Sequence, residues 1–449
     1  MSTGPQNIGS ARQMAAADPS HGTQRVAAGS IDISPQPPIA VGVVGRRATH
    51  LDGALEANVI LVDGHDGQPV VLVQIDTLFV DAHSTQSLAR YAGMDPGRMV
   101  LLASHTHSAP MLTDQLCPTA QYAPERRAAV EVRIGELISQ LVNAQRRQCA
   151  TRFGTVETPV NINRRSVGYF MDLRAARKGS LRLRRRCVMQ PDPYGPVDRL
   201  LRALRFDDES GHPVAVIWGF AAHPSRQPDR LSVSPDFPGR VRERLRARLG
   251  SHVAVLYVPG LAGSTVPLVP FAFPRGVGAL LRWMLPFLPY SHAFTTQSFS
   301  AWCNQLSSAA EQAVTSSRPV ALAPPRIVSG RSKKIFVGPG TGAGVELELR
   351  SVAFGPELVL AATSGEMLVE WLDVIPKRLL ENVWLTGYLA GRPTYLPTAA
   401  VIAEGGYEAE GFLAPFGMSG AFVPDIEATV IAALSEVIGD SMSGSPSGD

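Results

Sequence analysis

Cysteine is scarce in this chain, and the few cysteines lie far apart. The 449 residues include four of them, Cys117, Cys149, Cys187 and Cys303, with no CxxC pair. This spacing argues against a thiolate metal site or a redox motif and fits reduced thiols in a cytoplasmic protein. A strong charge bias is also lacking, because 42 lysines and arginines stand against 39 aspartates and glutamates for a net charge of +3. We therefore expect no nucleic-acid partner.

The sequence also lacks a segment typical of a membrane span or a signal peptide. Its longest uncharged stretch, residues 251–274, contains four prolines, which a transmembrane helix would not tolerate. The N-terminus has no apolar core of the kind that a secretory signal needs. Small and polar residues predict a disordered tail over residues 1–28 and another over residues 441–449. We expect a cytoplasmic location.

What the chain does contain is enough apolar sequence for a large core. Hydrophobic residues make up 45% of it, while 41 glycines and 36 prolines predict many loops and turns. The fold class we predict is mixed α/β, with one large domain over residues 29–440, mixed β-sheets flanked by helices, and a site at the strand ends. We expect strands at 57–64, 68–81, 98–104, 212–223, 253–258, 357–366 and 382–391, and helices at 124–148, 237–250, 293–316 and 425–438.

Polar side chains follow several of the predicted strands at their ends. His105 and His107 follow one strand, His223 ends another, and Glu366 ends a third. Because ligands bind at the carboxyl ends of strands in open sheets, these side chains can converge on one cleft. Histidine and carboxylate ligands suit zinc. Spacing alone leaves a metal site and a set of separate structural groups equally open.

The order of these motifs resembles the catalytic N-terminal domain of the neutral ceramidase family, over roughly residues 29–438. SHTHSAP is similar to the family's THTHSGP signature, and SGE is similar to its glutamate ligand motif. The other matching elements, in family order, are NINRRS (161–166), GPVDRLLRALRFDDESGHPVAVIWGFAAHPS (195–225), SPDFPG (234–239), YVPGLAGSTVP (257–267), YLPT (395–398) and GYE (406–408).

This resemblance implies a zinc ion held by His105, His223, Glu366 and Tyr395. It places His107 beside the metal, in contact with substrate or intermediate. Because a second titratable group must protonate the leaving amine, His107 is our candidate for that step.

The resemblance also implies groups around the metal. Arg164 would lie near the negative oxygen of the tetrahedral intermediate, with Arg165 as an alternative because the doubled arginine blurs the register. Tyr407 would place a hydroxyl close to the ligands or the substrate. The loop residues that would contact the substrate are Gly263, Ser264 and Thr265.

The glycine-rich loop departs from the family pattern. Ceramidases have GDVSP-like residues there, whereas Ser264 stands in the aspartate position and Val266 in the position of the serine proposed as nucleophile. A covalent serine mechanism at Val266 is excluded. Ser264 or Thr265 could replace that serine only with an activating base, and the sequence shows none. We therefore expect a metal-activated water as nucleophile and a substrate other than ceramide.

The function we predict is a zinc-dependent amidohydrolase that cleaves an amide bond in a small-molecule or lipid-like N-acyl substrate. An acyltransferase or cyclase in specialised-metabolite biosynthesis would use the same site, with an amine or hydroxyl in place of water. A catalytically degenerate binding protein is the interpretation from another class, motivated by the altered loop.

Two unusual segments remain open. Residues 268–290 are apolar and interrupted by proline, and they fit a buried insertion, a lid over the site or a weak membrane-surface contact. Residues 174–186 are strongly basic and fit a solvated loop or hairpin, or a surface that meets an acidic group.

Overall fold

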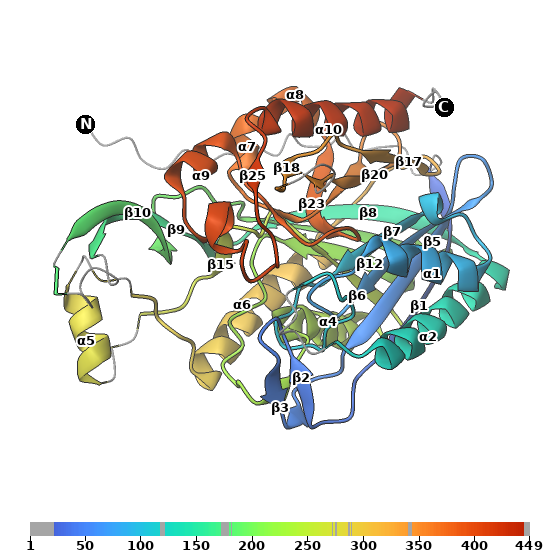
Figure 1. The fold of residues 1–449 in the computed structure, drawn as a ribbon. Coiled ribbons are helices and arrows are strands. Elements are labelled where there is room, and N and C mark those ends of the chain that lie inside the picture. The colour runs from blue at the N-terminus through green and yellow to red at the C-terminus, as the bar shows by residue number, and fades with distance from the viewer. Residues whose placement is uncertain are drawn as a thin grey trace.

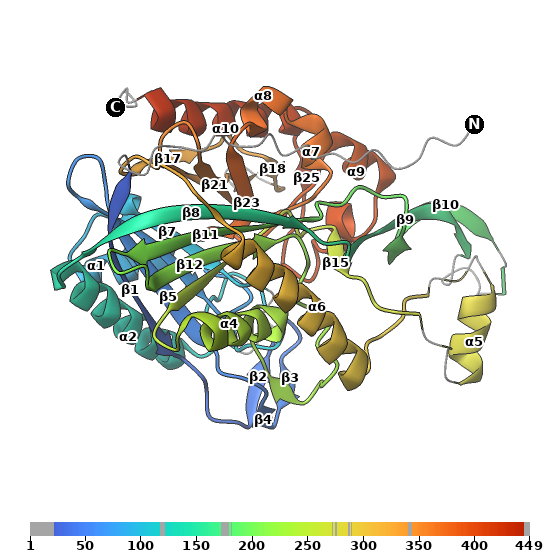
Figure 2. The same cartoon turned by 180° about the vertical axis from the view of Figure 1, so that it is seen from behind.

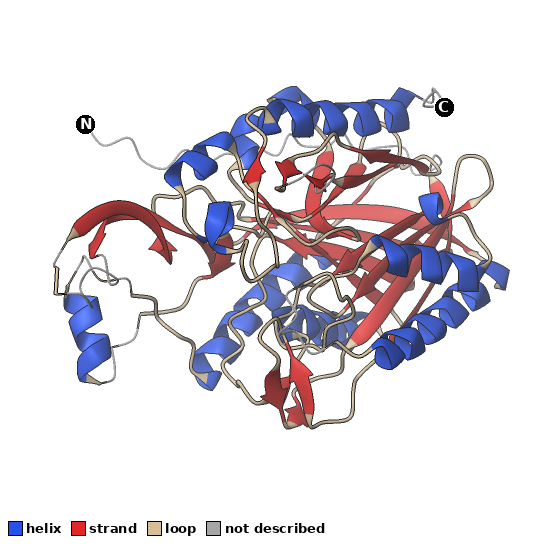
Figure 3. Cartoon of the chain, in the orientation of Figure 1, coloured by secondary structure: helices blue, strands red, loops and turns tan. Residues whose placement is uncertain are grey.

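One large sheet forms the centre of the molecule, and helices cover it on the outside (Figures 1 and 3). The computed structural model describes residues 22–116, 122–171, 179–180, 182–271, 273, 276–285, 288, 290–339 and 344–443. This architecture confirms the predicted mixed α/β class, with a mixed sheet and flanking helices in one large domain. Within the described residues, no helix combines the length and the apolar character that crossing a membrane requires.

The central sheet has 13 strands among the described residues. Their order is β14 (Ala254–Pro259), β12 (Pro213–Phe220), β11 (Leu200–Asp208), β8 (Arg147–Glu157), β1 (Thr23–Asp32), β5 (Glu56–Asp63), β6 (Pro69–Ile75), β7 (Met99–Ala103), β23 (Val383–Leu389), β21 (Val359–Ser364), β20 (Glu348–Ala353) and β17 (Arg326–Arg331), with β16 (Arg318–Pro319) beside β8. The pairs β6–β7, β12–β14 and β21–β23 are parallel, which makes the sheet mixed.

The sheet bends so that its two halves face each other across an inner core. Edge strand β14 lies against β5, β6 and β23, which are distant from it in the strand order. Successive residues of a strand point to opposite faces. On β5, for example, Ile60 and Val62 join the inner core, whereas Val59 and Leu61 face the outer helices. Nearly every residue of these central strands is therefore buried, which accounts for their continuous apolar runs.

Three groups of helices bury the outer faces of the sheet (Figure 2). They are α1 (Ala82–Ala92) with α2 (Pro124–Asn143) over β5 to β7, α4 (Asp236–Leu249) with α6 (Thr296–Thr315) over β11 to β14, and α10 (Ile426–Ser443) over β17 to β21. The local reason is clear in α2. Pro124 lies in its first turn, where the missing N–H costs nothing, and Val130, Ile134 and Ile138 form its buried stripe.

Short elements surround the strand ends where the site lies. The small sheets are β10 (Leu183–Asp192), β9 (Asn161–Met171) and β15 (Thr265–Pro267); β22 (Glu366–Met367) and β24 (Tyr395–Leu396); β13 (Ser232–Val233) and β4 (His50–Leu51); β2 (Ile39–Val41) and β3 (Arg46–Ala48); and β19 (Gly344–Val345), β18 (Phe336–Val337) and β25 (Ala421–Phe422). The short helices are α5 (Val277–Met284), α7 (Trp371–Val374), α8 (Lys377–Leu380), α9 (Ala399–Glu404), a 3-10 turn at Pro96–Arg98 and a π-turn at Tyr407–Gly411.

A strand and a helix extend into the two segments predicted to be disordered. Residues 23–28 belong to β1 and pair with β5 and β8, so the expected disorder up to residue 28 is wrong there. At the other end α10 continues to Ser443, and the Ser441 hydroxyl lies 2.8 Å from that of Ser351. Pairing with distant strands orders β1, although its composition is that of a tail. Residues 1–21 and 444–449 lie outside the described part of the chain.

The basic segment is a hairpin in its described part. Residues 183–186 form the first half of β10 and pair antiparallel with residues 168–171 of β9. Residues 174–178 and 181 of that segment lie outside the described residues.

One predicted helix is shorter than expected, because α2 ends at Asn143 and β8 begins at Arg147.

Candidate metal centre

Three histidine rings meet where β7 and β12 end. His105 and His107 follow β7, and His223 follows β12. Nε2 of His223 lies 3.2 Å from Nε2 of His105 and 2.9 Å from Nε2 of His107. These three nitrogens form a group that could hold a metal ion, with His105 and His223 buried and His107 half-buried. The two strands lie in opposite halves of the bent sheet, and the bend brings their ends together.

The outer nitrogens of two rings determine where their protons are. Nδ1 of His105 lies 2.8 Å from the Leu78 carbonyl oxygen, and Nδ1 of His223 lies 3.2 Å from that of Ala262. A carbonyl only accepts, so Nδ1 must be the protonated nitrogen in both rings. Each Nε2 then carries a lone pair, and the two lone pairs face each other. A cation between them would coordinate both lone pairs and remove this repulsion. Histidines that bind metals commonly donate their other N–H to a backbone carbonyl, as these two do.

Glu366 places a carboxylate oxygen in the same cluster. Its Oε2 lies 3.2 Å from Nε2 of His105 and 3.8 Å from Nδ1 of His223. This oxygen is buried and has no hydrogen-bond partner among the described residues. A buried charge without a donor is costly, and a metal ion would satisfy it. The set of imidazole nitrogens and a carboxylate oxygen therefore fits zinc.

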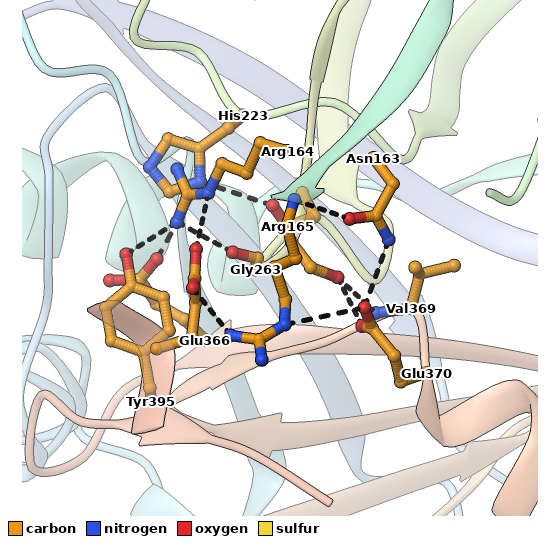
Figure 4. A network of polar contacts seen from close by, with 12 residues as sticks. Asn163, Arg164, Arg165, His223, Gly263, Glu366, Val369, Glu370 and Tyr395 are labelled. Atoms are coloured by element: carbon orange, nitrogen blue, oxygen red, sulfur yellow. Dashed lines mark hydrogen bonds and ion pairs between the residues drawn. The ribbon is translucent and has the colours of Figure 1, made fainter. Parts of the chain in front are cut away.

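Arg164 connects Tyr395 to the glycine-rich loop, as Figure 4 shows. Its Nη2 donates to the Tyr395 hydroxyl at 3.1 Å and to the Gly263 carbonyl at 2.7 Å. Tyr395 pairs directly with Glu366 in the short sheet β22–β24 and so lies beside the residue that contacts His105. Burial raises the pKa of Tyr395 well above its usual range, and the charge of Glu366 adds to this. The Tyr407 ring packs edge-on against Tyr395, with their centroids 5.6 Å apart.

Arg165 points to a different set of partners. Its Nη2 donates to the carboxylate of Glu404 at 3.1 Å and to the Gly405 carbonyl at 3.1 Å, while Nη1 donates to Glu408 at 2.8 Å. Glu408 also accepts from Nε of Arg164 at 2.8 Å, so one buried carboxylate holds both guanidinium groups. The sequence left open which of the two arginines lies near the other site residues. Arg164 contacts Tyr395, whereas Arg165 stabilises the turn before Tyr407.

The glycine-rich loop packs tightly against the strand that carries Glu366. The Gly263 N–H donates to the Met367 carbonyl at 3.0 Å, and a Cβ at residue 263 would lie 2.8 Å from the Glu366 carbonyl oxygen. The Thr265 hydroxyl donates to the Ala221 carbonyl at 2.9 Å, and the His223 N–H donates to the Thr265 carbonyl at 3.0 Å. Backbone contacts of Gly263 and Thr265 thus hold Glu366 and His223 in place.

Ser264 has a carboxylate partner that the sequence did not reveal. Its hydroxyl donates to Oε2 of Glu370 at 2.5 Å and accepts from the Val369 N–H at 3.1 Å. Asn163 donates to the other oxygen of Glu370 at 3.0 Å (Figure 4). Burial raises the pKa of Glu370 above its usual range. The structure thus places a carboxylate next to Ser264 that the sequence did not show, although this hydroxyl is fully buried and engaged within the protein.

Positive charge surrounds His107. Burial lowers its pKa well below the usual 6.5, and His105, Arg164, Arg230 and Arg46 lower it further. Burial likewise lowers the pKa of His223. Both rings are therefore neutral, which is the form that binds a metal. The same positive field would stabilise a negative oxygen formed beside the cluster.

Tyr388 is a neighbour of the cluster that the sequence analysis missed. Its ring lies 4.4 Å from the His105 ring, centroid to centroid, and its buried hydroxyl has no partner among the described residues. Both residues have left-handed backbone angles, with φ of 64° for Tyr388 and 65° for His105. Such strain costs roughly 1–3 kcal/mol per residue and gathers at functional sites. In the sequence Tyr388 stands inside an ordinary strand pattern, which does not indicate that its ring lies next to His105.

The overall arrangement matches solved structures although the sequence matches little. Neither a protein-family model nor a curated protein sequence matches the chain. A crystal structure of neutral ceramidase from Pseudomonas aeruginosa superposes with a TM-score of 0.66, covering 95% of this chain and 76% of that one, at 14% identity. The chain has a ceramidase-like fold. A ceramidase complexed with C2 gives a TM-score of 0.65 at 15% identity, covering 95% and 77% of the two chains.

The ceramidase-like fold brings together most of the residues predicted from motif order. His105, His107, His223 and Glu366 form one cluster, and Tyr395, Tyr407 and Arg164 adjoin it through the contacts above. Sequence reasoning missed Tyr388, Glu370 and Glu408. Glu408 stood within the GYE element and could have been found as a partner for the doubled arginine, since buried arginines need acidic partners.

Proposed function

We propose that this protein is a metal-dependent amide hydrolase with zinc as its metal. The observation that carries the proposal is the group of acceptor atoms around His105. Nε2 of His223 and Oε2 of Glu366 each lie 3.2 Å from its Nε2, and Oε2 of Glu366 has no hydrogen-bond partner among the described residues. No described donor faces Glu366 Oε2, and both histidine protons are committed to carbonyls. Burying acceptor atoms without a donor costs folding free energy, and a bound cation would offset that cost.

The proposed ligands are His105, His223, Glu366 and Tyr395. The two histidines have their Nδ1 protons held by backbone carbonyls, and Tyr395 lies opposite Glu366 in its short sheet. A bound zinc ion supplies a Lewis acid for the carbonyl and lowers the pKa of a water molecule.

His107 is proposed to move the proton. Its ring is neutral, its Nε2 faces the cluster, and its Nδ1 has no carbonyl partner of the kind that fixes the other two rings among the described contacts. Its tautomer is therefore free to change. Nε2 of His107 can accept a proton from water and return it to the nitrogen of the leaving amine.

Arg164 is proposed to stabilise the developing negative oxygen. Its guanidinium is buried beside Tyr395 and is held rigidly by Glu408 and the Gly263 carbonyl. Such a fixed positive group needs no reorganisation when charge develops. We propose an N-acyl, lipid-like amide as substrate, supported by the fold shared with ceramidases, and a substrate other than ceramide because of the altered loop.

Elemental analysis of zinc-loaded protein tests the metal. We expect about one zinc per chain in the wild type, none in His105→Ala or His223→Ala, and full content in the control His252→Ala, which changes an exposed histidine. His107→Gln is expected to keep its zinc but to lose the activity that releases amine from N-acyl amides. Mass spectrometry measures the released amine. A zinc-loaded wild type that retains no metal would overturn the proposal and favour a binding protein.

A further inference from the structure

Helix α5 presents an apolar stripe to solvent. Val277, Leu280, Leu281 and Met284 recur at the spacing of one helix face, which normally packs on a core. Here their exposed fractions run from 40% to 75%, and no residue of the helix is buried. An apolar face turned outward marks an interaction site.

Aromatic rings extend this apolar surface. Phe271 packs against Phe273 and Trp283, with centroid distances of 5.3 and 6.1 Å, and Phe273 lies 6.3 Å from Trp283. All three side chains are exposed. They contact one another instead of the cores of the domain, so the surface is organised yet uncovered. Large aromatic and aliphatic side chains of this kind enter the boundary between lipid headgroups and acyl chains.

A basic hairpin lies beside the apolar helix. Arg182, Arg184 and Arg185 are exposed on or next to β10. The Tyr290 N–H donates to the Gln190 side chain at 3.0 Å and so ties the segment after α5 to that strand. Both views show α5 and the β9–β10 hairpin projecting together from one side of the molecule (Figures 1 and 2). Neither segment 174–186 nor segment 268–290 contains an acidic residue.

We propose that α5 and the β9–β10 hairpin dock this protein on an anionic lipid membrane. Exposed apolar side chains next to clustered arginines match acyl chains below a layer of negative headgroups. A second copy of this chain is a poor occupant, because a symmetric contact would bring the same arginines together. The eight-residue helix is too short to span a bilayer, so the contact is with the surface.

The chain connects this docking surface to the candidate metal centre. Strand β15 joins the glycine-rich loop to the segment that leads to α5, and it pairs with β9, which carries Arg164. The delivery of a lipid-like amide from the membrane rests on the proposed function, whereas docking itself does not. His105→Ala protein should therefore still bind membranes, and the two proposals can fail separately.

Vesicle flotation tests the docking. We expect the wild type to float with phosphatidylcholine vesicles that contain phosphatidylserine and to bind pure phosphatidylcholine much less. Arg184→Glu with Arg185→Glu should weaken binding at least about fivefold for each charge removed, and added salt should weaken wild-type binding. Leu280→Asp with Leu281→Asp should abolish it. The controls are Val44→Asp and Arg133→Glu, which change exposed residues of β2–β3 and α2.

Three results would overturn the proposal. They are flotation that is equal in all variants, flotation that does not depend on phosphatidylserine, and no flotation by a folded wild type. In the third case, self-association that Leu280→Asp with Leu281→Asp disrupts in light scattering would assign the surface to a second copy of the chain.

Discussion

Arg164 and Arg165 are consecutive in β9, yet their guanidinium groups lie in different surroundings. Arg164 contacts the Tyr395 hydroxyl and the Gly263 carbonyl, whereas Arg165 contacts Glu404 and the Gly405 carbonyl. Of the two, only Arg164 contacts Tyr395, one of the proposed metal ligands. The shared carboxylate of Glu408 compensates both buried charges, which would otherwise be costly.

This difference predicts separate effects for two matched substitutions. Arg164→Lys should lower kcat for amide hydrolysis by about 100-fold, because lysine cannot reproduce the fixed fork of donors. Arg165→Lys should leave kcat within a few-fold and lower the midpoint of thermal unfolding instead. Steady-state kinetics and calorimetry on the two variants check this. Equal losses of kcat in both would show that the arginines act as one structural unit.

At the scale of elements, the loop before β15 packs closely against the strand β22. Gly263 lies so close to the Glu366 carbonyl that any side chain at residue 263 would displace either the loop or the strand. Because β22 carries the Glu366 side chain, the loop indirectly positions a proposed metal ligand. Gly263 therefore acts on the candidate metal centre through the backbone.

Gly263→Ala is expected to weaken zinc binding about 10- to 100-fold, the usual effect of disturbing a group that orients a ligand. Competition with a chelating dye measures that affinity. Gly278→Ala is the matched control, since a Cβ there meets nothing within 4 Å. Unchanged zinc affinity in a folded Gly263→Ala protein would show that the loop does not position Glu366.

At the scale of the whole molecule, stability should depend on pH through Asp236, the first residue of α4. Burial raises its pKa from 3.8 to about 7, and the charge of Asp52 also raises it, while N–H donors from Phe237 and Gln227 and the charge of Arg240 lower it. The folded state therefore holds a proton that the unfolded state loses. This contribution is complete below about pH 4 and is lost as pH rises through the folded pKa of about 7.

Asp236→Asn removes this dependence. Relative to the wild type, the free energy of unfolding of the variant should rise between pH 4 and pH 7, by at most about 4 kcal/mol. Asparagine also tolerates the left-handed φ of 56° at this position. Urea unfolding across that pH range measures the difference, with Asp373→Asn at an exposed carboxylate as control. A difference that stays constant with pH would show that Asp236 is ionised in the folded protein at all these values.

Much of the fold could be predicted from local patterns. The helix over 237–250 and the strand over 98–104 appear as α4 and β7 within a residue or two, because their apolar spacing matches the period of the element. Strand β1 could not be predicted, since its order comes from pairing with β5 and β8. The end of α2 was also placed too late, because Arg147 is recruited into β8.

The sequence by itself determined the mixed α/β class and the burial of the central strands, since both depend on residue type and short-range spacing. The candidate set of histidines, glutamate and tyrosine came from the resemblance of the ordered motifs to the neutral ceramidase family. Only the tertiary structure decided that β7 and β12 end at the same place, that Arg164 and not Arg165 meets Tyr395, and that Tyr388 and Glu370 lie beside these groups. These contacts join residues far apart in the chain, and the bend of one sheet creates them.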